Sequence, residues 1–166
     1  KNNNNIIKLK SGILIEKIKN SINIMSKSPK LTDRCKVSYI IQNKEGEIIE
    51  KEKMILRPAE IPIQSWGSLY TLMVEGDLWR AYIPPELAYG EYGREKLPPY
   101  SLLIIDLELF LVMGPGKSRD EARKAFEDAI LPTNSNNDND NNNNDNNNDN
   151  EIEFETDTDL ENDLEL

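Results

Sequence analysis

Residues 83–110 read IPPELAYGEYGREKLPPYSLLIIDLELF, and the prediction of the fold starts from this segment. Two proline pairs, Pro84-Pro85 and Pro98-Pro99, enclose a loop that holds two glycines and two tyrosines. Because proline fixes φ and cannot donate a ladder hydrogen bond, each pair is expected to separate two elements. A long apolar strand, residues 102–112, follows the second pair. The loop is interpreted either as a rigid aromatic wall of a binding pocket or as an ordinary surface connection.

Charge divides the chain into two parts. Residues 134–166 hold 12 acidic residues of the chain's 30 and none of its 20 basic residues, so this segment carries −12 and residues 1–133 carry +2. The net charge of −10 therefore does not describe the folded part. Residues 133–166 are rich in Asn, Asp and Glu with no apolar period, which predicts a disordered acidic tail. Its scattered apolar residues leave docking on a basic protein partner as an alternative.

The residue types that are absent exclude several kinds of chemistry. The chain has no histidine, which removes His-dependent triads and the commonest zinc and iron ligands. Cys35 is alone in an apolar alternating run and is interpreted as a buried, unreactive thiol. The segment MGPGKS, residues 113–118, lacks the first glycine of a phosphate-binding loop. We therefore expect no metal, no cofactor and no nucleic acid as ligand.

The sequence gives little information about the cellular compartment of the protein. No apolar run approaches the roughly 18 residues of a membrane span, and no signal-peptide pattern occurs. A chain that cannot form an internal disulfide fits a reducing compartment. The cytoplasm is the default expectation, and an organelle lumen is the alternative if a targeting segment before Lys1 has been removed.

Apolar alternation predicts most of the secondary structure. Residues 1–8 are mainly Lys and Asn and are predicted to be a flexible lead-in. A loop is expected at residues 20–33 and a turn at Lys44-Glu45-Gly46. The charged run EKEK, residues 50–53, predicts an edge strand or a bulge. Strands are predicted at residues 13–19, 35–42, 48–56, 78–83 and 102–112.

Two helices are predicted. The first has Ser65 as its cap and Gly76 at its end, and four residues share one apolar face: Trp66, Leu69, Tyr70 and Met73. The second opens with a capping box of Ser118 and Glu121, and its apolar stripe should pack on the domain or on a partner. Several antiparallel strands around one short helix indicate an α+β fold.

These features resemble the FKBP-type peptidyl-prolyl isomerases. The shared residues are Trp66 at the start of the core helix, Met73-x-x-Gly76, the motif Ile-Pro-x-x-Leu-Ala-Tyr-Gly-Glu at 83–91, Leu97-Pro98-Pro99, and Leu103-x-x-Asp106-x-x-Leu109. The segment Leu9–Ile13 is similar to the start of the macrophage-infectivity-potentiator-like branch. The resemblance covers residues 9–112, leaving 113–132 as a linker and a C-terminal helix.

The resemblance implies an antiparallel half-barrel sheet wrapped on one short helix, with an apolar pocket between them. Trp66 would be the pocket floor, and the Tyr89 hydroxyl and the Ile63 backbone N–H would hold the substrate backbone. The remaining pocket positions would be Tyr39, Ile49, Glu50, Pro62, Leu97 and Ile105. The implied activity is rotation of X-Pro amides in client proteins, which assists folding and requires no acid/base group.

The chain also departs from the family pattern. The family usually has Phe-Asp at the position of Ile49-Glu50 and phenylalanine at the position of Ile105, and a further aromatic before the helix has no counterpart here. Reduced isomerase activity and weak macrolide binding are therefore expected. The alternative is a catalytically weak or inactive module that binds proline segments in a protein complex.

Overall fold

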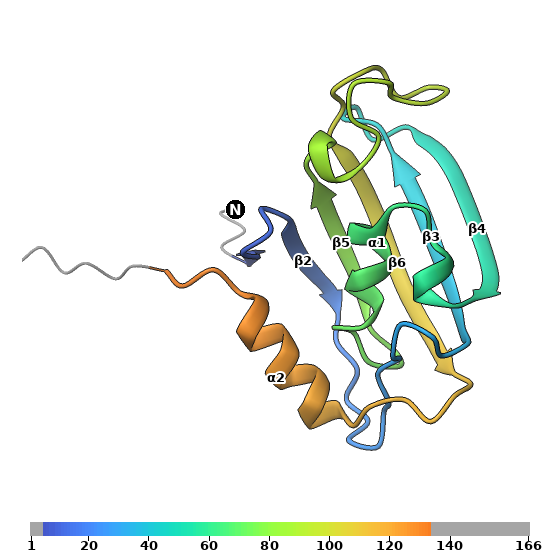
Figure 1. Ribbon diagram of the computed structural model, residues 1–166, viewed down its shortest axis with the longest axis vertical. Helices are drawn as coiled ribbons and strands as arrows, with labels where there is room; N and C mark the ends of the chain where they lie inside the picture. The colour runs from blue at the N-terminus through green and yellow to red at the C-terminus, as the bar shows by residue number, and fades with distance from the viewer. Residues whose placement is uncertain (1–4, 134–166) are drawn as a thin grey trace, which may run out of the picture. The chain divides into compact units, whose positions relative to one another are not determined.

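The computed structural model describes residues 5–133. The predicted acidic tail and its basic partner concern residues beyond Thr133, so they lie outside the described part. Six strands form one antiparallel sheet in the order β1-β2-β5-β6-β3-β4 (Figure 1). The strands are β1 (Ile6–Lys8), β2 (Leu14–Lys19), β3 (Cys35–Gln42), β4 (Ile48–Leu56), β5 (Leu78–Ile83) and β6 (Leu103–Val112).

The central strands bury one face each, as their alternation predicts. Val37, Tyr39 and Ile41 of β3 are buried, and Cys35 is fully buried at the start of the same strand. Strand β6 lies between β5 and β3 and alternates in the same way. The charged strand β4 pairs with β3 only and forms an edge of the sheet, which confirms the interpretation of EKEK. The α+β fold class is thereby confirmed.

The predicted flexible lead-in is wrong for residues 6–8. These residues form β1 and pair with β2, with Ile7 opposite Ile15. Leu9 is only 3% exposed and bridges Ile130, while the Lys10 N–H donates to the Ala129 carbonyl at 2.8 Å. Local composition could not predict this strand, because its partners lie in β2 and at the distant C-terminal end of the described chain.

The core helix α1 (Gln64–Tyr70) begins two residues earlier than predicted and also ends earlier. Its cap is Ile63 and not Ser65, whose hydroxyl donates instead to the Leu87 carbonyl at 2.6 Å. The helix ends at Tyr70, so Gly76 does not terminate it. Gly76 adopts a positive φ of 96°, which favours glycine, and its N–H donates to the Leu109 carbonyl at 2.7 Å. Four side chains nevertheless reach the core: Trp66, Leu69, Tyr70 and Met73.

The second helix, α2 (Arg119–Ala129), begins at Ser118 with the predicted capping box to Glu121. It lies on the β2 side of the sheet (Figure 1). Phe126 packs on Trp79 with ring centroids 5.2 Å apart, so the apolar stripe is buried against the domain. Within residues 5–133, no helix combines the length and the apolar character that crossing a membrane requires.

Candidate functional site

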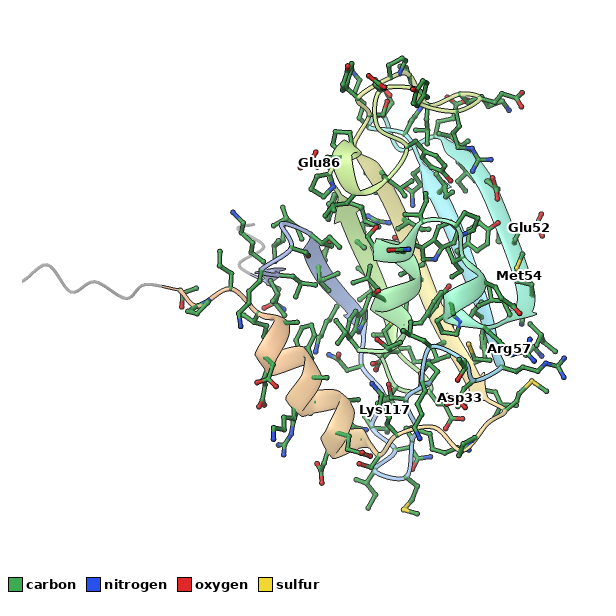
Figure 2. All side chains as sticks on the ribbon, in the orientation of Figure 1. Asp33, Glu52, Met54, Arg57, Glu86 and Lys117 are labelled. Carbon is green, nitrogen blue, oxygen red and sulfur yellow. The ribbon has the colours of Figure 1, made fainter. Side chains whose placement is uncertain are left out.

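A pocket of about 490 Å³ opens between β3, β4, α1 and the loop that joins β5 to β6. We call that loop, residues 84–102, the site loop. Met54 of β4 lines the pocket and lies between Glu52 of the same strand and Arg57, the residue that follows the end of β4 (Figure 2). The full lining is Tyr39, Glu50, Met54, Ile55, Leu56, Glu60, Ile61, Pro62, Trp66, Tyr89 and Arg94.

The floor of the pocket is aromatic. Trp66 at the start of α1 meets Tyr39 of β3 edge to face, with ring centroids 4.6 Å apart. Tyr70, one turn further along α1, is fully buried and donates its hydroxyl to the Ser38 carbonyl at 3.2 Å. Burial is the main cause that raises the pKa of Tyr70, so this hydroxyl stays protonated. The floor is therefore fixed by packing and by a bond to the sheet backbone.

A polar network runs along the rim. The Tyr39 hydroxyl donates to one carboxylate oxygen of Glu50, and the Arg94 guanidinium donates to the other. Arg94 also donates through Nη1 to the Tyr89 hydroxyl oxygen at 2.9 Å, and its guanidinium carbon lies 5.3 Å from the centre of the Tyr89 ring. The network thus links β3, β4 and the site loop across the pocket mouth.

The charges in this network are stable at neutral pH. The hydrogen bond from Tyr39 is the largest cause that lowers the pKa of Glu50; burial opposes it, and Arg94 adds to it. Burial, followed by the hydrogen bond to Glu50, raises the pKa of Tyr39. A carboxylate is therefore held ionised beside a neutral phenol and a guanidinium.

The site loop is shaped by local hydrogen bonds. The Pro85 carbonyl accepts from the N–H groups of Ala88 and Gly90, and Arg94 and Leu97 exchange backbone bonds at 2.9 Å. Gly93 has φ of 62°, and a Cβ there would lie 2.4 Å from the Leu97 carbonyl oxygen. Only glycine fits this close approach. The turn that follows from it directs Arg94 toward Tyr89.

The pocket contains five of the nine residues that the resemblance implied: Tyr39, Glu50, Pro62, Trp66 and Tyr89. The other four do not line it. Ile105 is fully buried in β6, between Ile41 of β3 and Ala81 of β5. Leu97 lies within the site loop with its side chain buried in the core, and Ile49 is partly buried against the core. Ile63 caps α1, and its side chain lines a separate groove of about 610 Å³.

Arg94 is the main site residue that the sequence did not point to. The other additions are Met54, Ile55, Leu56, Glu60 and Ile61. A usable signal existed for Arg94, because it stands five residues after Tyr89 in a loop tightened by two glycines. Met54, Ile55 and Leu56 of β4 were not recognised. An edge strand exposes both faces, so the alternation of its side chains does not reveal which of them turn toward a pocket.

Known proteins share this sequence and this architecture. Residues 25–110, just over half of the chain, match the family described as FKBP-type peptidyl-prolyl cis-trans isomerase. The chain belongs to this family. It is 36% identical over 134 residues to the macrophage infectivity potentiator of Trypanosoma cruzi, covering 74% of this chain and 67% of that protein. The FKBP-type 22 kDa peptidyl-prolyl cis-trans isomerase of Escherichia coli is 36% identical over 90 residues, covering 51% of this chain and 44% of that protein.

Solved structures agree with the sequence matches. A peptidyl-prolyl cis-trans isomerase from Pseudomonas syringae aligns with a TM-score of 0.58 and 26% identity, covering 66% of this chain and 81% of that one. FkpA from Escherichia coli has the same TM-score and 25% identity, covering 66% of this chain and 52% of that one. The FKBP-type domain and its place in the macrophage-infectivity-potentiator-like branch are confirmed. The enzyme class expected from the sequence is the one its relatives are named for, and the binding-module alternative is not favoured.

Proposed function

We propose that the pocket between Tyr39, Trp66 and Tyr89 takes up the proline of an X-Pro segment and lowers the barrier to rotation of the preceding amide. The aromatic floor of the 490 Å³ pocket is the observation that carries the proposal. Amide rotation has a barrier of about 18–20 kcal/mol because resonance is lost in the twisted state. No proton has to move. A site that binds the twisted amide better than the planar one is therefore sufficient.

Two groups are suited to hold the substrate backbone. The Tyr89 hydroxyl lies at the pocket rim and can donate to a substrate carbonyl. The backbone N–H of Ile63 precedes α1, and no acceptor for it occurs in residues 5–133. Bonds that are stronger to the twisted amide than to the planar one accelerate rotation. The apolar walls also remove water from the amide, and water favours its planar, charge-separated form.

The substrates are proline-containing peptides and proteins. The wall next to the floor is formed by Met54, Ile55, Leu56 and Ile61, all of them apolar. A bulky apolar residue before proline would bury more surface there than a small or charged residue, at about 25 cal/mol per Å² of apolar area. The proposed preference is therefore for Leu, Ile or Phe before proline. Client proteins with exposed segments of this kind are the proposed partners.

A protease-coupled or NMR-exchange assay on a series of X-Pro peptides tests the function. The full chain should accelerate isomerisation, and most strongly when X is bulky and apolar. Trp66→Leu serves as the pocket-directed comparison, with thermal melting measured in parallel. An uncatalysed rate that stays unchanged for every X, together with peptide binding, would favour the module that binds without turnover. No rate change and no binding would reject the pocket altogether.

A further inference from the structure

The Tyr89 hydroxyl accepts a hydrogen bond but donates none within the described residues. Arg94 donates to its oxygen at 2.9 Å, and within residues 5–133 no acceptor takes its proton. A phenol has one O–H donor and lone pairs that accept. Because Arg94 has no acceptor atom, it can fill only a lone pair of Tyr89. The hydroxyl proton of Tyr89 is therefore free to be donated to a ligand. Because Tyr89 lines the pocket, a ligand in the pocket can accept it.

Arg94 is itself held from the opposite side. Its second nitrogen donates to Glu50, whose other carboxylate oxygen accepts from Tyr39. The Arg94 side chain is 33% exposed and that of Glu50 is 26% exposed, so solvent and salt screen the pair less than they would a pair at the open surface. Hydrogen bonds with an ionised partner are also about twice as strong as neutral ones. The guanidinium orientation is thus fixed on two sides.

We infer that Arg94 is a positioning residue for isomerisation, which orients the Tyr89 hydroxyl and polarises its O–H bond toward the substrate carbonyl. The inference rests on the proposed function, because it assigns the hydroxyl to the substrate. Arginine suits this task because its planar fork presents donors in two directions at once. A lysine ammonium has three donors but no fixed fork, so it would not hold Glu50 and Tyr89 in one geometry.

Arg94 could make the same contacts and serve only to hold the site loop in place. The two roles differ in how the Arg94 and Tyr89 substitutions combine in their effect on catalysis. If the Arg94 to Glu50 pair only holds the site loop in place, its loss affects catalysis independently of the Tyr89 hydroxyl. If Arg94 acts through that hydroxyl, its effect disappears once the hydroxyl is gone. Coupled residues show non-additive effects in a double-mutant cycle, whereas independent ones add. The cycle therefore separates the two roles.

The test measures kcat/KM on one X-Pro peptide for the wild-type chain, Tyr89→Phe, Arg94→Met and the double variant. We expect Tyr89→Phe to lower kcat/KM by about tenfold, the loss expected for one hydrogen bond. Arg94→Met should lower kcat/KM by about threefold to tenfold, because it weakens the same hydrogen bond without removing the hydroxyl. The double variant should be no slower than Tyr89→Phe alone. Additive losses, or an unchanged rate for Arg94→Met, would overturn the inference.

The chain offers a matched control and a second approach. Arg123 pairs with Asp120 at 3.5 Å on α2 and does not line the pocket, so Arg123→Met should leave kcat/KM unchanged. Glu50→Gln keeps the side-chain shape but removes the charge that holds Arg94, so it should lower the rate in the same direction and lose that effect in the Tyr89→Phe background. If the wild-type chain is inactive, the proposed function itself fails. An active wild type with an additive cycle rejects only the role of Arg94.

Discussion

Trp66 meets Tyr39 edge to face, with ring planes at 74° and centroids 4.6 Å apart. Both residues are 7% exposed, so the floor of the pocket is also part of the hydrophobic core. Such T-shaped pairs place the positive edge of one ring on the negative face of the other, a gain of about 0.5–1.5 kcal/mol beyond area burial. Substrate binding and stability therefore depend on the same contact.

Trp66→Leu should lower stability and catalysis together. The change removes the aromatic pair and leaves a cavity under the pocket, and large-to-small core substitutions cost about 2–5 kcal/mol. The measurement is urea unfolding, paired with kcat/KM below the unfolding transition. Arg123→Met, at an exposed side chain of α2, is the control and should change neither quantity. Normal activity in a destabilised Trp66→Leu protein would show that the indole packs the core without contacting substrate.

Gly67→Ala should destabilise the fold although alanine favours helices. In an unstrained helix interior the change would gain about 1 kcal/mol. Here a Cβ on Gly67 would lie 2.3 Å from the Pro58 carbonyl oxygen, closer than atoms can approach, so α1 must shift away from the short 3₁₀ helix η1 (Pro58–Glu60). Overpacking typically costs about 1–3 kcal/mol of stability. Here the added methyl group would clash with backbone atoms, which cannot move aside as a flexible side chain could. A raised melting temperature would contradict the close packing of α1.

The strands were predictable because each central strand carries its own signal. Cys35–Gln42 and Leu78–Ile83 alternate cleanly and lie inside the sheet, so both were predicted with the observed bounds. The ends of α1 were not predictable in the same way. Ser65 has the chemistry of a cap but donates to Leu87 instead, and that partner comes from a different part of the chain. Tertiary contacts of this kind cannot be derived from local propensity.

The candidate site was predicted in part for a similar reason. Trp66 and Tyr89 lie in motifs whose order is specific, and both line the pocket. Ile105 was assigned to the pocket by position, but isoleucine is shorter than the phenylalanine usual there and is fully buried in β6. Arg94 enters the site only because the backbone turn at Gly93 directs it to Glu50 and Tyr89. Its role depends on three-dimensional geometry.

Macrolide affinity should be low in this pocket. Glu50 stands where the family usually has aspartate, and its carboxylate oxygens already accept from Tyr39 and Arg94, so a ligand hydroxyl or amide would have to compete with both. Ile105 also supplies no aromatic wall. Titration calorimetry with a macrolide ligand checks this, with an FKBP-type isomerase that has the Phe-Asp pair as the comparison. Nanomolar affinity for this chain would contradict the prediction.

Cys35 should be unreactive in the folded protein. Its side chain is fully buried, its thiol contacts the Leu56 carbonyl oxygen at 3.5 Å, and burial followed by the charge of Asp33 raises its pKa to about 11. Because the thiolate is the nucleophile, a neutral thiol without solvent access reacts slowly. A thiol-specific dye should therefore label the native chain at pH 8 far more slowly than the chain in denaturant. Equal labelling rates would show that the start of β3 opens readily.

The same thiol should make stability depend on pH in the alkaline range. Its folded pKa lies above the unfolded value of about 8.5, so its contribution is complete below pH 8.5 and is lost as the pH rises toward about 11. The melting temperature of the wild-type chain should therefore fall over this range. The melting temperature of Cys35→Ala should fall less, because the titrating group is absent. Other groups titrate there in both proteins, so the difference between the two profiles is the quantity to measure. Parallel profiles would mean that Cys35 does not contribute to the alkaline loss of stability.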